Sequence, residues 1–124
     1  MEKDFDLIVL HGGHSGTDNF RKGARVTQLL KKMDGFSKNI AAICAAPLVL
    51  MDAWILGNRY ITSHTSVQND LQGINYKDDR VVVDGNIVTS KSPGTAMEFA
   101  FKLVEILFGQ ERRDVINKGV LAKI

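Results

Sequence analysis

The chain has 124 residues, enough for one domain with a modest hydrophobic core. Sixteen basic and fourteen acidic side chains leave a formal net charge of +2, which is too small to indicate binding to nucleic acid or to a membrane surface. A single cysteine excludes an internal disulfide and is typical of a reducing compartment, so we expect a cytoplasmic protein. The charged start, Met1–Asp6, has no signal-peptide core, and Pro47 interrupts the longest apolar run, so no membrane span is expected.

The first apolar run, residues 6–10, predicts a short buried strand that ends in a glycine-rich loop, residues 11–16. The Gly-Gly-x-x-Gly spacing of this loop differs from the dinucleotide-binding fingerprint, which argues against a phosphate site. His11 and His14 lack a third ligand, so neither a metal nor a cofactor is expected. The glycines are better explained by close approach of the backbone, with the Gly13 N–H exposed as an oxyanion donor.

A helix is predicted next, capped by Thr17 or Asp18 and ended by Asp34 and Gly35. Its apolar residues recur at the spacing of one buried helix face: Val26, Leu29, Leu30 and Met33. The basic residues of this segment lie mostly off that face, which is typical of a solvated helix surface.

Residues 38–44 form an Ile- and Ala-rich run that predicts a second buried strand, ending at Cys44. Pro47 fits the first turn of a following helix, which we expect to include residues 48–56. Cys44 would then lie on a sharp strand-to-helix turn, the device that presents the nucleophile of α/β hydrolases. The start of the helix would favour the thiolate. A lone cysteine is also typical of a small buried hydrophobe, and the turn alone does not decide between the two interpretations.

In the second half, Gly57 and Asn58 predict a turn, and residues 59–63 a strand that ends at His64. A lone histidine in this position is more often a hydrogen-bonded structural residue than a base. A short helix over 66–71 and a hairpin turning at Asp84-Gly85 are expected to follow.

Thr95 is expected to cap a long helix that ends at Gly109, and a last amphipathic helix is expected over 111–121. The long helix has a predicted apolar face: Ala96, Phe99, Ala100, Leu103, Val104 and Leu107. The alternation of strands and helices predicts an α/β fold with a mostly parallel sheet, helices on both faces, and catalytic loops at the carboxyl ends of the strands.

Four stretches resemble, in the right order, motifs of the DJ-1/PfpI superfamily in its DJ-1/ThiJ branch. Residues 6–13 resemble its strand and Gly-Gly loop, 40–47 its cysteine turn, 82–90 its late hairpin, and 92–100 its Gly-Pro-Gly-Thr turn and last long helix. The resemblance implies a flavodoxin-like sandwich of the class I glutamine amidotransferase type. It also implies that residues 1–124 are the C-terminal two thirds of a single domain whose N-terminal strands are missing.

Three positions depart from the family's pattern. His11 replaces a proline in the glycine loop, Thr65 replaces the proline that usually follows the histidine, and Ser92 stands where glycine is preferred.

The resemblance also implies roles for individual residues. Cys44 would be the nucleophile and His64 the active-site histidine, while the N–H groups of Gly13 and Ala45 would bind an oxyanion. The acidic residue that hydrogen-bonds the family's cysteine belongs to the missing portion, so no Asp or Glu of this chain is assigned to it. The exposed sheet edge left by that portion would be covered in a homodimer or by a complementary N-terminal chain.

The activity that the resemblance implies is that of a cofactor-free glyoxalase or deglycase acting on methylglyoxal, related small dicarbonyls and their adducts. An alternative is a redox-sensing or chaperone-like stress protein that uses an oxidisable Cys44. A cysteine peptidase is less expected because Ala45, not histidine, follows the cysteine. A glutamine amidotransferase is less expected because the C-terminal third has no histidine.

Overall fold

The structure is a computed structural model that describes residues 5–122, so the first four residues of the charged start lie outside it. The main sheet has the order β1-β2-β6-β5, in which β1, β2 and β6 are parallel and β5 is antiparallel to β6. A separate parallel pair is formed by β3 and β4. The strands are β1 (Leu7–Leu10), β2 (Asn39–Ile43), β3 (Tyr60–Ile61), β4 (Asn75–Tyr76), β5 (Val81–Asp84) and β6 (Ile87–Ser90).

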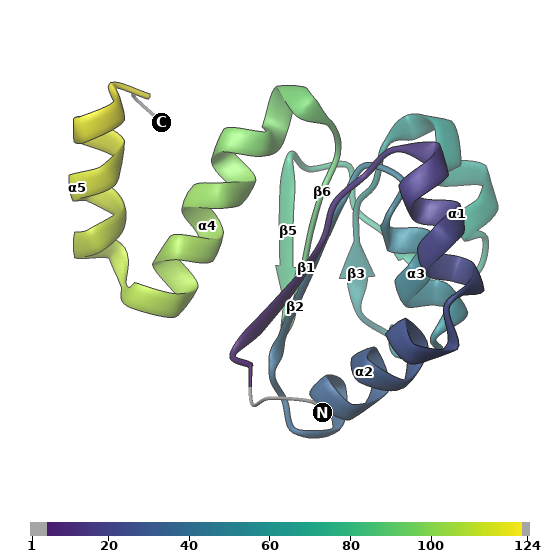
Figure 1. The fold of residues 1–124 in the computed structure, drawn as a ribbon. Coiled ribbons are helices and arrows are strands. Elements are labelled where there is room, and N and C mark those ends of the chain that lie inside the picture. Colours follow the sequence, from purple (N-terminus) through teal and green to yellow (C-terminus); the bar gives the residue numbers. More distant parts are fainter. Residues whose placement is uncertain (1–4, 123–124) are drawn as a thin grey trace.

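Helices lie on both faces of the main sheet, with α1, α2 and α3 on one side and α4 on the other (Figure 1). The predicted α/β fold with a mostly parallel sheet is therefore confirmed. The helices are α1 (His14–Lys22), α2 (Ala24–Gly35), α3 (Pro47–Asp52), α4 (Ala96–Phe108) and α5 (Gln110–Val120), with 3₁₀ turns η1 (Thr65–Leu71) and η2 (Pro93–Thr95). None of the described helices is both long and apolar enough to cross a bilayer.

The central strand β2 holds the two layers together, because both of its faces are covered. Ile40 and Ala42 belong to the larger core beneath α1–α3, and Ala41 packs with Val88 and Phe99 beneath α4. All three β2 residues are completely buried, which explains why this strand is apolar from Ile40 to Ile43 rather than alternating.

The first helix begins earlier than predicted. Gly13, at a φ of 92°, is the N-cap of α1, so the glycine loop shrinks to residues 11–13. Thr17 lies within α1 and is only 2% exposed, so neither it nor Asp18 is a cap. A break at Gly23 then divides the predicted single helix into α1 and α2. The left-handed φ of Gly13 permits the helix to start directly after the strand.

Helix α2 has the predicted inner face, with Leu30 and Met33 buried and Val26 and Leu29 packed beside them.

Helix α3 ends at Asp52, short of the predicted residue 56, because Trp54 adopts a left-handed φ of 58° just beyond it. The strand expected over 59–63 is limited to Tyr60–Ile61. Beyond it, the Thr62 N–H bonds to the side-chain hydroxyl of Thr89 in β6 rather than to a backbone carbonyl. The short helix predicted over residues 66–71 is the 3₁₀ turn η1. The predicted hairpin between β5 and β6, which turns at Gly85, is confirmed.

The predicted apolar face of α4 is only partly buried. Phe99 is 5% exposed and packs on the sheet with Leu103, but Ala100 and Leu107 are exposed. Helix α5 packs on α4, where the Arg113 guanidinium lies 5.7 Å from the centre of the Phe101 ring.

Replacing Ile40 by alanine is expected to lower the free energy of unfolding by about 2–5 kcal/mol, because a completely buried side chain would leave a cavity in β2. Phe36→Ala is the control, since Phe36 is 69% exposed and its loss should change stability by only about 0.5 kcal/mol. Urea unfolding measures both. Equal effects of the two substitutions would contradict the assignment of β2 to the core.

Candidate functional site

Cys44 lies on the predicted turn between β2 and α3, with a left-handed φ of 63°. This conformation costs an L-residue roughly 1–2 kcal/mol, so the surrounding structure must hold it. The Cys44 N–H donates to the Ser90 carbonyl (3.1 Å), and the Cys44 carbonyl accepts from the His64 N–H (2.9 Å). The turn is thus fixed from both sides, by the end of β6 and by the segment leading into η1. Pro47 occupies the first turn of α3, as predicted.

Gly12 forms the steric wall beside the thiol. A Cβ at position 12 would lie 2.5 Å from the Cys44 Cβ and 3.0 Å from its Sγ. Only glycine therefore fits here without displacing Cys44. The close backbone approach predicted for the glycines of this loop is confirmed at Gly12. Its contact with Cys44 was not predicted, although paired glycines directly after a buried strand were the signal that could have identified it.

The backbone N–H groups of Gly13 and Ala45 lie in the two loops that follow β1 and β2. These strands are paired neighbours, with Leu10 opposite Ala42, so both loops lie at the same edge of the sheet. Within residues 5–122, neither N–H group has a hydrogen-bond acceptor. Both are therefore available to an added acceptor, while their role in oxyanion binding stays a prediction.

The His64 ring is held by Ser66. Its Nδ1 accepts the Ser66 N–H (3.0 Å) and lies 2.8 Å from the Ser66 Oγ. Because a backbone N–H only donates, Nδ1 carries the lone pair and the neutral imidazole carries its proton on Nε2. In the described part of the chain, no hydrogen bond joins this ring to the Cys44 sulfur. The structure brings the two residues together through their backbones.

Burial raises the pKa of the Cys44 thiol above its ordinary value. The expectation that the helix start would favour the thiolate is therefore wrong for this arrangement. Helix α3 is only six residues long, and no charged group offsets the loss of hydration of the sulfur. Activation of the thiol needs a further group that removes its proton.

A network of hydroxyl groups holds the loop after β6. Ser90 Oγ donates to the Arg80 carbonyl and lies 2.6 Å from Thr95 Oγ1, which also accepts the N–H groups of Lys91 and Ser92. Ser92 itself is extended, with a φ of −166°, so serine replaces the family's glycine without strain. The loop therefore stays rigid beside the turn that carries Cys44.

His11 packs against α1. Its ring lies 5.4 Å from that of Phe20, and its Nδ1 lies 3.2 Å from the Gly12 carbonyl oxygen. Gly16 leaves room for it, since a Cβ there would lie 3.2 Å from the imidazole Cε1. Over the residues that the structure describes, no three His, Cys, Asp or Glu side chains gather in a metal-binding cluster.

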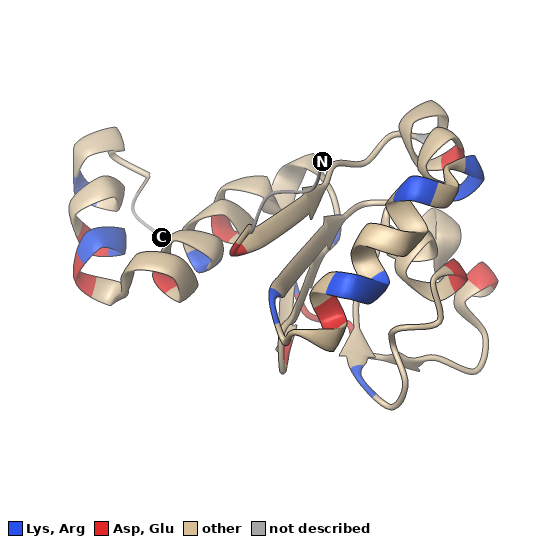
Figure 2. Ribbon diagram, turned by 60° about the horizontal axis from the view of Figure 1, so that its bottom comes forward, with Lys and Arg blue, Asp and Glu red and all other residues tan. Residues whose placement is uncertain are grey.

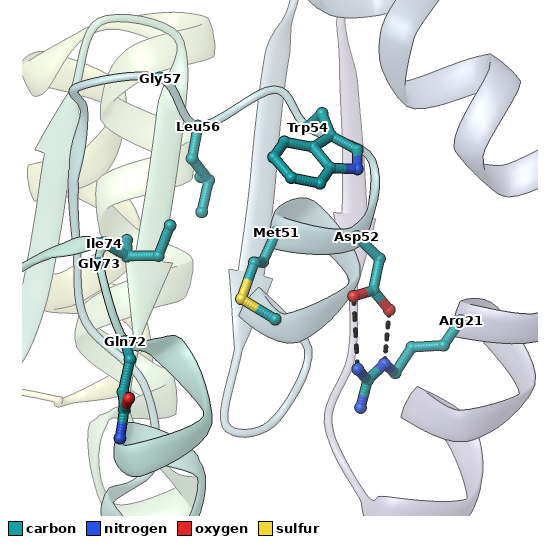
Figure 3. A pocket seen from close by; sticks show the side chains of 9 residues that line it. All are labelled: Arg21, Met51, Asp52, Trp54, Leu56, Gly57, Gln72, Gly73 and Ile74. Carbon is teal, nitrogen blue, oxygen red and sulfur yellow. Dashed lines mark hydrogen bonds and ion pairs between the residues drawn. The ribbon is translucent and has the colours of Figure 1, made fainter.

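A cavity of about 800 Å³ lies at the other end of α3 (Figure 3). An ion pair between Arg21 and Asp52 forms one wall, with contacts of 2.5 and 3.3 Å, and the hydrogen bond that Arg21 donates to Asp52 raises the pKa of Arg21. Trp54, which is 88% exposed, stands beside it. The lining contains neither Cys44 nor His64, so this cavity is separate from the thiol site.

The model of the DJ-1/PfpI family matches residues 1–106. The chain belongs to the DJ-1/PfpI family. It is 41% identical to protein dj-1beta of Drosophila melanogaster over 119 residues, which cover 94% of this chain and 64% of that protein. The crystal structure of Drosophila DJ-1beta superposes with a TM-score of 0.92 over 95% of this chain and 64% of that one.

Two further DJ-1/PfpI proteins are similar. The chain is 40% identical over 124 residues to the glutathione-independent glyoxalase DJR-1.2 of Caenorhabditis elegans, covering 98% of this chain and 66% of that protein. A structure of oxidized Toxoplasma gondii DJ-1 superposes with a TM-score of 0.91 at 33% identity, over 96% of this chain and 65% of that one. The chain spans between 28% and 66% of the lengths of six curated relatives that it matches.

Gly12→Ala is expected to lower the free energy of unfolding by about 1–3 kcal/mol, because the new Cβ forces the Cys44 turn to move. Gly35→Ala is the matched control. Nothing lies within 4 Å of a Cβ at that position in α2, so this change should stabilise the chain by about 0.4–1 kcal/mol. Urea unfolding compares the two, and equal stabilities would contradict close packing of Gly12 on Cys44.

The raised pKa of Cys44 predicts a pH dependence of alkylation. Iodoacetamide reacts with the thiolate, so the rate for the folded chain should reach its midpoint at a higher pH than for the same chain unfolded in urea. A folded midpoint at or below the unfolded one would contradict the effect of burial.

Proposed function

We propose that this chain provides the nucleophile site of a cysteine-dependent, cofactor-free enzyme of the glyoxalase or deglycase type. Its substrates are methylglyoxal, related dicarbonyls and their adducts. The observation that carries the proposal is the left-handed turn at Cys44, with the thiol against Gly12 and two unpaired N–H groups at the same sheet edge. The likeness to a C. elegans protein named as a glutathione-independent glyoxalase supports this class of chemistry.

The first step is attack of the Cys44 thiolate on the aldehyde carbon of methylglyoxal. A C–S bond forms, and the carbonyl electron pair moves to oxygen, where the N–H groups of Gly13 and Ala45 stabilise the charge. Protonation of that oxygen gives a hemithioacetal.

A proton then moves from the former aldehyde carbon to the neighbouring ketone carbon. The first carbon is thereby oxidised to a thioester and the second reduced to an alcohol. Water cleaves the thioester, which yields a hydroxy acid and restores the thiol. His64 is the proposed proton carrier in these transfers, since its backbone position beside Cys44 places it at the site.

Full activity also depends on a group that deprotonates Cys44, because burial raises the pKa of its thiol. We propose that a carboxyl group supplied by a further polypeptide does this, in a homodimer or through a complementary N-terminal chain. A reducing compartment such as the cytoplasm would keep this free thiol available.

A second candidate is a redox-sensing or chaperone-like role. Cys44 is a free, half-buried cysteine whose sulfur has no hydrogen-bonded base among the described residues, and oxidation to sulfenic acid needs fewer catalytic groups than turnover does. The likeness to a DJ-1 protein described in its oxidized state is consistent with this role.

Cys44→Ser is expected to reduce methylglyoxal consumption at least a hundredfold, because a serine hydroxyl lacks the nucleophilicity of a thiolate. Hydroxy-acid formation, followed by chromatography, measures it. Phe36→Ser is the control, since this exposed side chain lies outside the site and its loss should leave turnover unchanged. Undiminished turnover by Cys44→Ser would refute the covalent mechanism.

Mild peroxide treatment followed by mass spectrometry separates the two candidates. Conversion of Cys44 to sulfenic or sulfinic acid in a chain that does not consume methylglyoxal would favour the redox role. An unmodified Cys44 would count against it.

A further inference from the structure

Trp54 is the single tryptophan of the chain, and it stands where neither packing nor backbone geometry favours this residue. It is 88% exposed, so its side chain contributes little to the core. It directly follows Ala53, the C-cap of α3, and has a φ of 58°, at the position where helices usually place glycine. The stability of the fold therefore does not explain the indole, and a strained, exposed aromatic residue is a candidate for a binding role.

Trp54 lines the cavity of about 800 Å³ at the end of α3 (Figure 3). This volume lies in the range of pockets that hold small organic molecules. The lining includes three apolar side chains, Met51, Leu56 and Ile74, all of which belong to the larger core or pack against it. The fold thus holds the apolar floor in place, while the exposed indole beside it can contact an added molecule.

Two side chains of the lining favour an aromatic ligand. The indole face of Trp54 can stack on a flat ring, which stabilises binding beyond the burial of apolar surface. The Met51 side chain extends between the apolar floor and the ion pair of Arg21 with Asp52 (Figure 3). Its thioether sulfur makes favourable contacts with aromatic rings. An aliphatic ligand would gain neither interaction.

The charges of the cavity favour an uncharged ligand. Among the described residues that line it, only Arg21 and Asp52 are charged, and two contacts pair them with each other. Basic and acidic residues are also interspersed along the described chain (Figure 2). A charged ligand would lose its hydration without gaining an unpaired counter-ion in the lining.

We propose that the cavity at the end of α3 binds a small, flat and uncharged aromatic compound, which stacks on Trp54 and covers the floor formed by Met51, Leu56 and Ile74. This site is distinct from the thiol site, because α3 separates the cavity from the turn at Cys44. Its test therefore measures binding and not turnover.

Naphthalenemethanol is the probe, because it is flat, aromatic and uncharged. Its fully hydrogenated analogue has the same carbon skeleton without the aromatic rings, and naphthoate adds a negative charge to the same rings. In saturation-transfer NMR titrations of the full chain, naphthalenemethanol should bind about fivefold more tightly than the hydrogenated analogue, since only aromatic rings stack on the indole. Naphthoate should also bind more weakly. A change in the emission of the single tryptophan would locate the bound probe at Trp54.

Trp54→Gly separates binding from stability. Loss of the indole should weaken the binding of naphthalenemethanol about tenfold. Glycine at this left-handed φ should at the same time raise the urea midpoint of unfolding. A lower midpoint would mean that the indole supports the fold, which would contradict the argument for a binding role.

Phe36→Gly is the matched control. Phe36 is also an exposed aromatic residue that directly follows a helix, α2, and it is 69% exposed. Because it lies outside the lining of the cavity, its substitution should leave the binding of naphthalenemethanol unchanged.

Asp52→Asn tests the role of the ion pair. The substitution removes the carboxylate that neutralises Arg21, so naphthoate should then bind more tightly than naphthalenemethanol. An unchanged preference would contradict the exclusion of charged ligands by this pair.

Four further results would overturn the proposal: no binding of naphthalenemethanol, equal binding of its hydrogenated analogue, undiminished binding by Trp54→Gly, or equal weakening by Phe36→Gly. A chain that binds naphthalenemethanol but does not consume methylglyoxal would contradict the proposed activity and confirm this cavity as a separate site.

Discussion

The site depends on one constraint, the left-handed turn at Cys44. This conformation is unfavourable for an L-residue and is held by two backbone hydrogen bonds, from the Cys44 N–H to Ser90 and from the His64 N–H to Cys44. These bonds connect β2, the end of β6 and the start of η1, three segments that are distant in sequence. Gly12 must then be glycine, because its backbone passes against the thiol. The position of the sulfur thus depends on contacts between several strands of the sheet and not on the turn alone.

The sequence predicted the features that depend on local pattern. The buried strand ending at Cys44, the proline in the first turn of α3 and the hairpin at Gly85 are all present. Two element boundaries were missed. Helix α3 ends before Trp54, whose φ is left-handed, and β3 ends where the Thr62 N–H bonds to the distant Thr89 hydroxyl. The close approach predicted for the glycine loop occurs at Gly12, against Cys44. The bond from the Ser66 N–H to His64 was missed although it is local, between residues two positions apart.

Burial raises the pKa of the Cys44 thiol, and among the described residues no base is hydrogen-bonded to its sulfur. Within the same residues, the outer edge of β1, which leads into the glycine loop, has no paired strand.

The central claim is that the turn presents Cys44 as a nucleophile toward an aldehyde carbon. The direct measurement is a carbon NMR spectrum of methylglyoxal labelled at the aldehyde carbon, recorded with the chain in excess. The account predicts a hemithioacetal resonance that disappears when Cys44 has first been alkylated. A spectrum that is identical before and after alkylation, with only free and hydrated methylglyoxal, would contradict it.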